Sequence, residues 1–373
     1  MAMGADSSMQ RIARLTPLDA VLACIQARVA PVPPRRYPLA SAQGATLAED
    51  VFSPERPPRA IALRDGFAVA AATIADAGPY TPVPVTLIAR RIDVGDPLPN
   101  GTDAVVPLEA IALHGDRAEA TAAVAPGEGV LQAGDDAAPG TALRRAGERL
   151  RAVDVAVMAA AGIAEVTVRS PRIALVSGSA ARTPILDAAR ATLAHGIERA
   201  GGCLRDSSDL LEAALNDRQS DAVIVVGGTG SGRRDGAVQE VARRGELKAH
   251  GIAIGPGDTA AFGFVDKRPV LLSPGRLDAA LAVWLFIGRQ LTAKLAGGAI
   301  DETPAMLLLK HKVTSTIGIT ELVPVRRSDG MAKPLGSGYL SFTALAHSHG
   351  WIAVPADSEG FAAGAEVAVN QWP

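Results

Sequence analysis

The chain has few aromatic residues, few cysteines and little excess of charge. Phe, Trp and Tyr make up 3% of its 373 residues, which leaves little material for stacking on nucleic-acid bases. The net charge is −2 and the arginine pairs are scattered, so no nucleic-acid partner is expected. The two cysteines, Cys24 and Cys203, lie far apart in no CxxC spacing, which argues against a disulfide framework and a zinc site.

Long apolar runs are also missing from the chain. It contains no uninterrupted stretch of about 18 apolar residues and no signal-peptide core at the N-terminus. We therefore expect no membrane partner and a cytoplasmic location. What the chain does have is 48% hydrophobic residues with 38 glycines and 26 prolines, which predicts several domains with small-residue cores and many sharp turns.

The stretch DAVIVVGGTGSGRRD, residues 221–235, is the most informative of the chain. A β-branched run is followed by a loop with four glycines, and this loop ends at Asp235. The next segment has the helical spacing of Val238 and Val241. This order favours an anion site, because glycine permits close approach of a ligand and the first N–H groups of a helix are unpaired. A carboxylate there indicates a divalent metal that also touches a phosphate. The alternative is a tight strand-to-helix turn that binds nothing.

Composition and periodicity change along the chain and predict four domains. Strands alternating with helices predict an α/β domain with a doubly wound parallel sheet, which binds ligands at the carboxyl ends of its strands. Short apolar runs between turns predict β domains. The fold class is therefore α/β plus β, and the expected domains are a discontinuous N-terminal domain whose two stretches pack together, an inserted β domain, the α/β domain and a small C-terminal β barrel (10–50 with 146–170; 51–145; 171–300; 301–373).

Four loops of small residues follow successive predicted strands of the α/β domain. Because such loops meet at one edge of a sheet, we expect them to form the binding site together. A valine at Gly228 is expected to block the ligand and leave stability nearly unchanged. The expected cofactor-binding residues are Ser177, Gly178, Gly227, Gly228, Thr229, Gly230, Ser231, Gly232, Pro256, Gly257, Ser273, Pro274, Gly275 and Arg276.

The order of motifs along the chain is typical of one family. ERPPRAIALRDGFAV, GDPLPNGTDAVVPLE and GEGVLQAGDDAAPGTALRRAGERL come first, and PRIALVSGS, SDAVIVVGGTGSGRRD, IAIGPGDTAAFG and LLSPGRLDAALAV follow. With these motifs the chain resembles the molybdopterin molybdenumtransferase family, the MoeA and gephyrin E-domain group. The resemblance extends over nearly the whole chain, residues 14–370.

The resemblance implies a transferase of molybdenum cofactor biosynthesis. Its substrates would be molybdate and molybdopterin in its adenylylated form, with Mg²⁺ or another divalent cation as cofactor. It also implies a homodimer in which the inserted domain of one subunit faces the α/β domain of the other, and other molybdenum-cofactor biosynthesis proteins as partners. The family's acidic positions carry over to Asp65, Asp136, Asp206 and Asp235 as catalytic residues, with Asp206 and Asp235 as metal ligands. The local alternatives are turn formers for Asp65 and Asp136 and a helix cap for Asp206.

Several loop positions depart from the family pattern. Ser179 and Ala180 stand where the family has Asp-Glu, and Asp258 stands where it has a lysine. An aspartate repels an anionic substrate unless a metal bridges them or Arg276 compensates, so molybdenum insertion is expected to be weak, strongly Mg²⁺-dependent, or absent under standard conditions. The departures leave two other functions open: a non-catalytic molybdopterin-binding paralogue that acts as carrier or regulator, and a dimeric scaffold protein.

Overall fold

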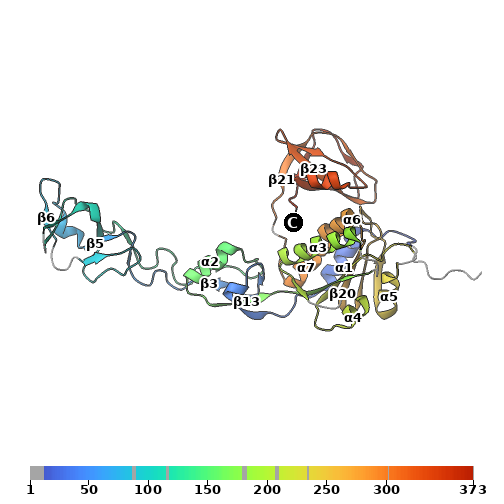
Figure 1. Cartoon of the computed structure of the whole chain (residues 1–373), viewed down its shortest axis with the longest axis horizontal. Coiled ribbons are helices and arrows are strands. Elements are labelled where there is room, and N and C mark those ends of the chain that lie inside the picture. The colour runs from blue at the N-terminus through green and yellow to red at the C-terminus, as the bar shows by residue number, and fades with distance from the viewer. Residues whose placement is uncertain are drawn as a thin grey trace, which may run out of the picture. The chain divides into compact units, whose positions relative to one another are not determined.

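The computed structural model describes residues 12–85, 90–114, 117–178, 183–205, 210–232, 235–300 and 302–372 (Figure 1). The chain divides into two units. The first consists of Met1–Glu49, Ala146–Ala152 and Glu165–Pro373, and the second of Asp50–Arg145 and Val153–Ala164. The chain therefore leaves the first unit twice and returns to it twice. The division into four domains remains a prediction.

The first unit is built on a six-stranded sheet. Its strand order is β15-β14-β16-β20-β19-β17. The central strand β16 is buried along its whole length, as its run of β-branched residues requires. The strands are β14 (Arg172–Ser177), β15 (Cys203–Arg205), β16 (Ala222–Val226), β17 (Glu246–His250), β19 (Ala261–Val265) and β20 (Arg268–Ser273).

The sheet is mixed, so the prediction of a doubly wound parallel sheet is wrong in part. β15, β14, β16 and β20 run parallel, whereas β19 pairs antiparallel with both β20 and β17. The reason is the two-residue turn Asp266-Lys267, which has positive φ at both positions (50° and 66°) and closes a hairpin between β19 and β20. Such a turn usually carries glycine or asparagine, so Asp266-Lys267 is not recognisable as a hairpin turn from its residue types.

Helices cover both faces of this sheet. α1 and α3 pack with the long helix α6–η4–α7 against Ile173, Ile224 and Leu271, while α4 and α5 pack against Val223 and Val225 on the other face. α3 begins at a capped end, where the Thr183 hydroxyl accepts a hydrogen bond from the Leu186 N–H. The helices are α1 (Leu18–Arg28), α3 (Pro184–Arg199), α4 (Leu211–Asn216), α5 (Ala237–Arg244), α6 (Leu277–Val283), the π-helical η4 (Trp284–Gly288) and α7 (Arg289–Ala296).

By length and hydropathy the continuous helix Leu277–Ala296 could cross a membrane. However, 78% of its most apolar window is buried inside the protein. Trp284, in the π-helical turn, is 1% exposed and lies where a Cβ on Gly196 of α3 would be 2.5 Å from its Nε1. The helix is therefore the central core helix of the α/β domain.

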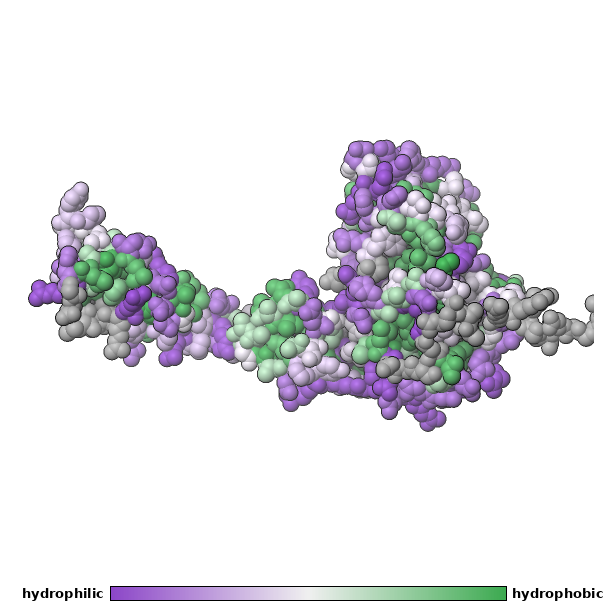
Figure 2. All heavy atoms as spheres, viewed as in Figure 1, coloured by the Kyte–Doolittle hydropathy of each residue, from purple (hydrophilic) through white to green (hydrophobic). Residues whose placement is uncertain are grey.

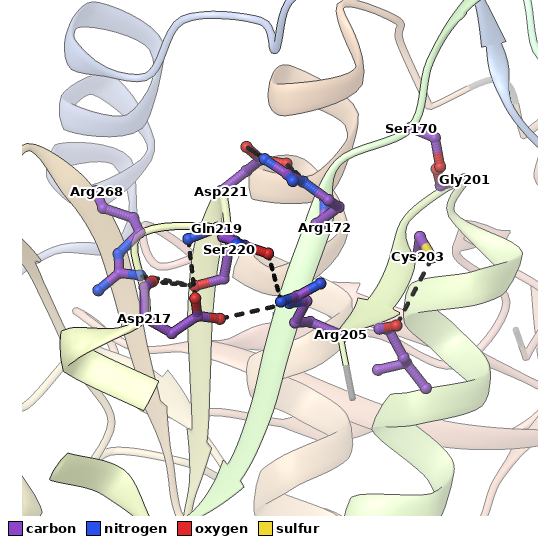
Figure 3. A network of polar contacts seen from close by, with 11 residues as sticks. Ser170, Arg172, Gly201, Cys203, Arg205, Asp217, Gln219, Ser220, Asp221 and Arg268 are labelled. Atoms are coloured by element: carbon purple, nitrogen blue, oxygen red, sulfur yellow. Dashed lines mark hydrogen bonds and ion pairs between the residues drawn. The ribbon is translucent and has the colours of Figure 1, made fainter. Parts of the chain in front are cut away.

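Polar side chains join the amino ends of β14, β16 and β20 to the last residue of the short edge strand β15 (Figure 3). Arg172, the first residue of β14, donates from its backbone N–H (2.7 Å) and its guanidinium (3.3 Å) to Asp221. Arg205 donates to Gln219 Oε1 at 2.6 Å, and the Gln219 N–H donates to Asp217 Oδ1 at 2.9 Å. This network ties the loop before β16 to the neighbouring strands and has a structural role.

We expect replacement of Arg268 by methionine to lower the free energy of unfolding by about 2–3 kcal/mol. Arg268 donates to Ser220 Oγ at 2.7 Å and to the carbonyl of Asp217 (Figure 3). It also donates to the carbonyl of Leu215 at 2.6 Å, so its loss removes three hydrogen bonds at the end of α4. Urea unfolding measures the effect. The control is Arg218→Met, whose side chain is 87% exposed and should cost under about 0.5 kcal/mol. Equal effects of the two substitutions would contradict the prediction.

The strands after residue 302 close on themselves. β23 pairs with β24, β24 with β21 and β21 with β27, while a bridge from Asn370 to Trp351 joins β27 to β25, which pairs with β23. Val323, Val325 and Ile352 fill the interior. The elements are β21 (Ala305–Leu309), β22 (Val313–Thr314), β23 (Thr320–Ser328), β24 (Met331–Pro334), α8 (Phe342–His347), β25 (Gly350–Val354), β26 (Gly360–Phe361) and β27 (Glu366–Val369).

The two outer stretches of the expected N-terminal domain meet only in part. β13 (Glu165–Arg169) lies between β1 (Arg35–Pro38) and β2 (Thr46–Leu47) in a small antiparallel sheet, with the 3₁₀ turn η1 (Leu39–Ser41) beside it. Helix α1, however, packs on α7 in the core of the α/β domain. The expectation that the helix near residue 155 packs with it is wrong, because α2 (Ala152–Ala160) falls almost entirely in the second unit.

The second unit consists of short antiparallel ladders and α2. Asp154 of α2 is 7% exposed and forms an ion pair with Arg144 (Nη2 to Oδ2, 3.3 Å), which holds α2 to the β12–β3 pair. Small cores lie around Val69, Ile74 and Val106 and around Ala68 and Val105. The elements are β3 (Val51–Phe52), β4 (Ile61–Ala62), β5 (Gly66–Val69), η2 (Ala71–Ile74), β6 (Val83–Pro84), β7 (Arg90–Ile92), β8 (Ala104–Pro107), η3 (Leu108–Ala110), β9 (Ile111–His114), β10 (Arg117–Ala120), β11 (Val130–Leu131) and β12 (Ala142–Arg144).

One face of α2 is apolar and exposed. Val153 is 55% exposed and Val157, one turn further along, is 47% exposed. Figure 2 shows hydrophobic surface where Figure 1 places α2. Two exposed valines four residues apart form a stripe along one side of a helix, which is typical of a face that packs on another element.

Candidate functional site

Three loops lie side by side at the carboxyl ends of β14, β16 and β20. The Gly178 N–H donates to the carbonyl of Val226 at 3.0 Å, and the Gly227 N–H donates to the carbonyl of Ser273 at 2.8 Å. The ladders therefore continue one residue beyond the strands. The described residues of these three loops therefore meet as predicted, whereas the predicted fourth loop follows β18 (Ile254–Gly255), which pairs with the barrel strand β23 and not with this sheet.

The glycines of these loops let backbone pack on backbone. A Cβ on Gly178 would be 2.1 Å from the carbonyl oxygen of Gly227, and a Cβ on Gly228 would be 2.3 Å from that of Gly178. Gly275 is less tightly packed, since its ideal Cβ would lie 3.4 Å from the Cα of Gly227. The loops need glycine for their own packing, so the expectation that Gly228 tolerates valine is wrong.

The predicted binding residues differ in exposure. Seven of them are buried, so their side chains are not accessible to a ligand: Gly227, Gly228, Thr229, Pro256, Gly257, Ser273 and Pro274. The half-buried or exposed set forms the surface of this edge: Ser177, Gly178, Gly230, Ser231, Gly232, Gly275 and Arg276.

The loop before β19 reaches the same edge. Because β19 runs antiparallel to β20, its amino end lies beside the carboxyl end of β20, with Ala261 opposite Leu272. The loop is also tied to the barrel, since β18 (Ile254–Gly255) pairs in parallel with Thr320 and Glu321 of β23. Asp258 is exposed on this loop. Antiparallel pairing therefore brings Asp258 to the site edge.

Two threonines and a histidine connect the glycine loop to this second loop. Thr229 Oγ1 lies 3.1 Å from Thr259 Oγ1, and Thr229 is 2% exposed. His250 Nε2, at the end of β17, lies 3.1 Å from the carbonyl oxygen of Thr229. The sequence reasoning missed His250, because only the tertiary fold brings the end of β17 to the glycine loop.

We expect the two threonine hydroxyls to be energetically coupled. Thr229→Val and Thr259→Val each remove one hydroxyl without changing the side-chain shape, and the two losses should fall short of additivity by about 1 kcal/mol because they share one hydrogen bond. Urea unfolding of both single variants and the double variant measures this coupling. Additive losses would show that the hydroxyls do not interact.

Asp235 folds back on the glycine loop. Its Oδ2 accepts from the Gly232 N–H at 2.9 Å, and a Cβ on Gly230 would be 2.8 Å from the same oxygen. The first N–H of α5, on Ala237, donates to the carbonyl of Gly228 at 3.3 Å. Asp235 therefore holds the loop shape. One accepted hydrogen bond uses about one of the four acceptor positions of a carboxylate.

Arg276 is held by a buried carboxylate. Its Nε and Nη2 donate to Asp278 at 3.1 and 2.5 Å, and Asp278 is 4% exposed. This hydrogen bonding to Asp278 is the main cause that raises the pKa of Arg276, and Asp258 adds a weaker attraction. Arg276 therefore interacts mainly with Asp278 and only weakly offsets the negative charge of Asp258.

A barrel loop lies against the same residues. The Leu340 N–H donates to Asp278 Oδ2 at 3.2 Å, and the Gly338 N–H donates to Glu321 Oε1 at 2.5 Å. Between them, the Tyr339 ring centroid lies 5.1 Å from the Arg276 guanidinium carbon. Sequence reasoning did not single out Tyr339, although it stands in a Gly/Ser-rich segment, GSGYLS.

Two of the predicted acidic residues lie in the second unit. Asp65 is exposed, and its Oδ1 accepts a hydrogen bond from the Val94 N–H at 2.8 Å. Asp136 is exposed in a turn, and its own backbone N–H donates to the carbonyl of Arg56 at 3.1 Å. The β4–β11 register, with Val130 opposite Ala62, places them beyond opposite ends of one ladder. Both positions agree with the turn alternative as well as with a functional role.

Arg64, next to Asp65, has a local partner. Its Nη2 donates to Glu128 at 3.0 Å. Together with a hydrogen bond from the Ala125 N–H, which is the larger cause, this contact lowers the pKa of Glu128. Asp206, Ser179 and Ala180 lie outside the described residues.

Comparison with known proteins identifies relatives along the whole chain. The model of the MoeA N-terminal region (domains I and II) matches residues 16–162, that of the "Probable molybdopterin binding domain" matches residues 173–294, and that of the MoeA C-terminal region (domain IV) matches residues 307–372. A protein of Methanocaldococcus jannaschii named for molybdopterin biosynthesis is 27% identical over 85% of this chain and 87% of its own length. Molybdopterin molybdenumtransferase 1 of Mycobacterium tuberculosis is 28% identical over 71% of this chain and 76% of its own length.

A solved structure shows the same fold. The molybdopterin biosynthesis MoeA protein of Pyrococcus horikoshii superposes with a TM-score of 0.71 at 26% sequence identity, over 96% of this chain and all of that one. The similarity therefore extends across both units and is not limited to the α/β domain.

Proposed function

The chain belongs to the MoeA family, and from this membership we propose that it inserts molybdate into adenylylated molybdopterin during molybdenum cofactor biosynthesis. The observation that carries the proposal is the meeting of the predicted binding loops at one edge of the α/β sheet, within a chain that matches the family's three regions in order. Relatives named molybdopterin molybdenumtransferase support the same reaction.

In the proposed reaction the exposed loop residues bind the substrate. Ser231, exposed on the glycine loop, offers its hydroxyl to phosphate oxygens, whereas the Gly232 N–H is already held by Asp235. Arg276 contributes a positive charge to this edge and is held in position by Asp278. Thr229, Thr259 and His250 position the glycine loop and are not expected to touch the substrate.

A divalent cation fits this site only together with the substrate. Within the described ranges, no three His, Cys, Asp or Glu side chains gather to hold a metal ion. Mg²⁺ commonly binds through one or two carboxylates plus substrate phosphates, and Asp235 could supply one such carboxylate. When bound, the ion would neutralise phosphate charge beside Asp235 and Asp258. A role for Asp206 as second ligand remains a prediction.

We propose that the protein is a homodimer in which Asp65 and Asp136 approach the α/β domain of the partner subunit. The exposed stripe of Val153 and Val157 on α2 supports association with a second copy. Light scattering at micromolar concentration should give twice the chain mass of 38.2 kDa. A monomer at that concentration would contradict the proposal. The cytoplasmic location and contacts with other molybdenum-cofactor proteins also remain predictions.

Genetic rescue and an in vitro assay test the proposed function together. The gene should restore molybdoenzyme activity in a strain that lacks its own insertion enzyme, and the purified protein should convert adenylylated molybdopterin and molybdate to molybdenum cofactor with release of AMP. Failure of both, with a folded dimeric protein, would refute the proposal.

Asp258→Lys should tighten binding of the anionic substrate. The substitution removes a negative charge from an exposed loop position at the site edge and adds a positive one. Because water and salt screen an exposed position, we expect roughly a three- to tenfold lower KM, with a smaller effect at high salt. Asp258→Asn should give about half the change in free energy. An unchanged KM would indicate that Asp258 does not face the substrate.

A further inference from the structure

Tyr339 is presented on a loop whose two flanking N–H groups are both held by buried carboxylates. The Gly338 N–H donates to Glu321, which is 8% exposed, and the Leu340 N–H donates to Asp278, which is 4% exposed. One carboxylate belongs to the barrel and the other to the start of α6. The loop, which connects β24 to α8, is therefore anchored both to the barrel and to the first turn of α6.

The residues next to Tyr339 are fixed as well. The side chain of Leu340 is 1% exposed and belongs to the core of the α/β domain. Ser341 caps α8 by accepting from the Ala344 N–H at 3.1 Å. Tyr339 itself is 65% exposed. The ring is therefore accessible to a ligand, while the backbone on both sides of it is held by hydrogen bonds.

Arg276 covers part of the ring. Its guanidinium carbon lies 5.1 Å from the ring centroid, in the range of a cation–π contact. Asp278 takes hydrogen bonds from Nε and Nη2 of Arg276. A guanidinium has five N–H groups, so others can donate to a phosphate at the same place. An aromatic surface and a phosphate donor thus stand side by side at the site edge.

We infer that Tyr339 and Arg276 form the contact site for a planar heteroaromatic ring that carries a phosphate, with the ring stacked on Tyr339 and the phosphate beside Arg276. The inference rests on the proposed function, whose substrate contains two such rings, a pterin and an adenine. It assigns to the barrel domain a substrate contact within the same chain. Tyr339 is then a specificity-determining residue that favours the aromatic substrate over free inorganic phosphate.

Titration calorimetry on the full chain tests this contact with AMP, molybdopterin and inorganic phosphate as separate probes. Stacking on an aromatic side chain is lost in Tyr339→Ala, so the Kd for AMP or for molybdopterin should rise about 5- to 100-fold, and the probe affected identifies the ring. The Kd for inorganic phosphate should stay within about twofold. Tyr339→Phe keeps the ring and should bind like the wild type, as should Tyr80→Ala, which removes a tyrosine that is 99% exposed.

The result that overturns the inference is an unchanged Kd of Tyr339→Ala for both AMP and molybdopterin, or an equal loss for phosphate. This outcome is distinguishable from failure of the proposed function. If the wild type inserts molybdenum and Tyr339→Ala does so with the same KM, only the proposed contact is refuted. A chain that binds AMP or molybdopterin through Tyr339 but inserts no molybdenum refutes only the proposed reaction.

Discussion

Replacing Gly228 by alanine will lower the free energy of unfolding by about 3–5 kcal/mol. Gly228 has a φ of +74°, which L-residues rarely adopt, and its Cβ would lie 2.3 Å from the carbonyl oxygen of Gly178. The obstacle is backbone, and the Gly178 N–H is itself bonded to Val226, so the neighbouring loop has no room to move. Urea unfolding followed by circular dichroism measures the loss.

Gly236→Ala is the matched control at the other end of the same loop. Gly236 has nothing within 4 Å of an added Cβ and a φ of −146°, so alanine should cost below about 1 kcal/mol there. If the two alanine variants were equally stable, the close packing of the strand-end loops would be refuted. Loss of ligand binding in a Gly228 variant therefore says nothing about ligand contact unless folding is measured too.

Asp235→Asn will lower Mg²⁺-dependent molybdenum insertion by about 100-fold. The asparagine keeps a side-chain oxygen for the Gly232 N–H, so the loop should retain its shape. It removes the negative charge that we propose for contact with the cation. The measurement is the insertion rate over a range of Mg²⁺ concentrations, where the variant should need far more Mg²⁺.

Two further variants separate the charge of Asp235 from its hydrogen bond. Asp235→Ala removes both and should lose activity and some stability. Asp266→Asn removes an exposed carboxylate from the β19–β20 turn at the opposite edge of the sheet and should behave as wild type. If Asp235→Asn kept the wild-type Mg²⁺ response while Asp235→Ala lost activity, Asp235 would be a loop-holding residue and not a metal contact.

The family relationship and the coarse fold could be predicted from local patterns. The run of β-branched residues at 222–226, the glycine loop behind it and the helical spacing of 238–241 correspond to β16, its loop and α5. The matched family regions confirm the resemblance read from the motif order. Such features depend on residues close in sequence, which is why periodicity and turn chemistry revealed them.

Roles that depend on distant residues could not be predicted. The loop glycines suggested close approach of a ligand, but at Gly178 and Gly228 the closest group is the backbone of the neighbouring loop. Arg276 was expected to compensate Asp258, but its main partner is Asp278, two residues further on. Tyr339 and His250 carried no motif, since each matters only through a contact with another loop.

By itself, the sequence determined the type of protein: α/β plus β domains, strand-end loops rich in glycine, and membership in one family. These follow from hydrophobic period, glycine placement and motif order, which are properties of neighbouring residues. Only the tertiary structure decided which loops touch, that β19 is antiparallel and so brings Asp258 to the site edge, and that the barrel presents Tyr339 beside Arg276. The reason is that strand direction and loop contact are set by pairing between segments far apart in the chain, where no local pattern records the partner.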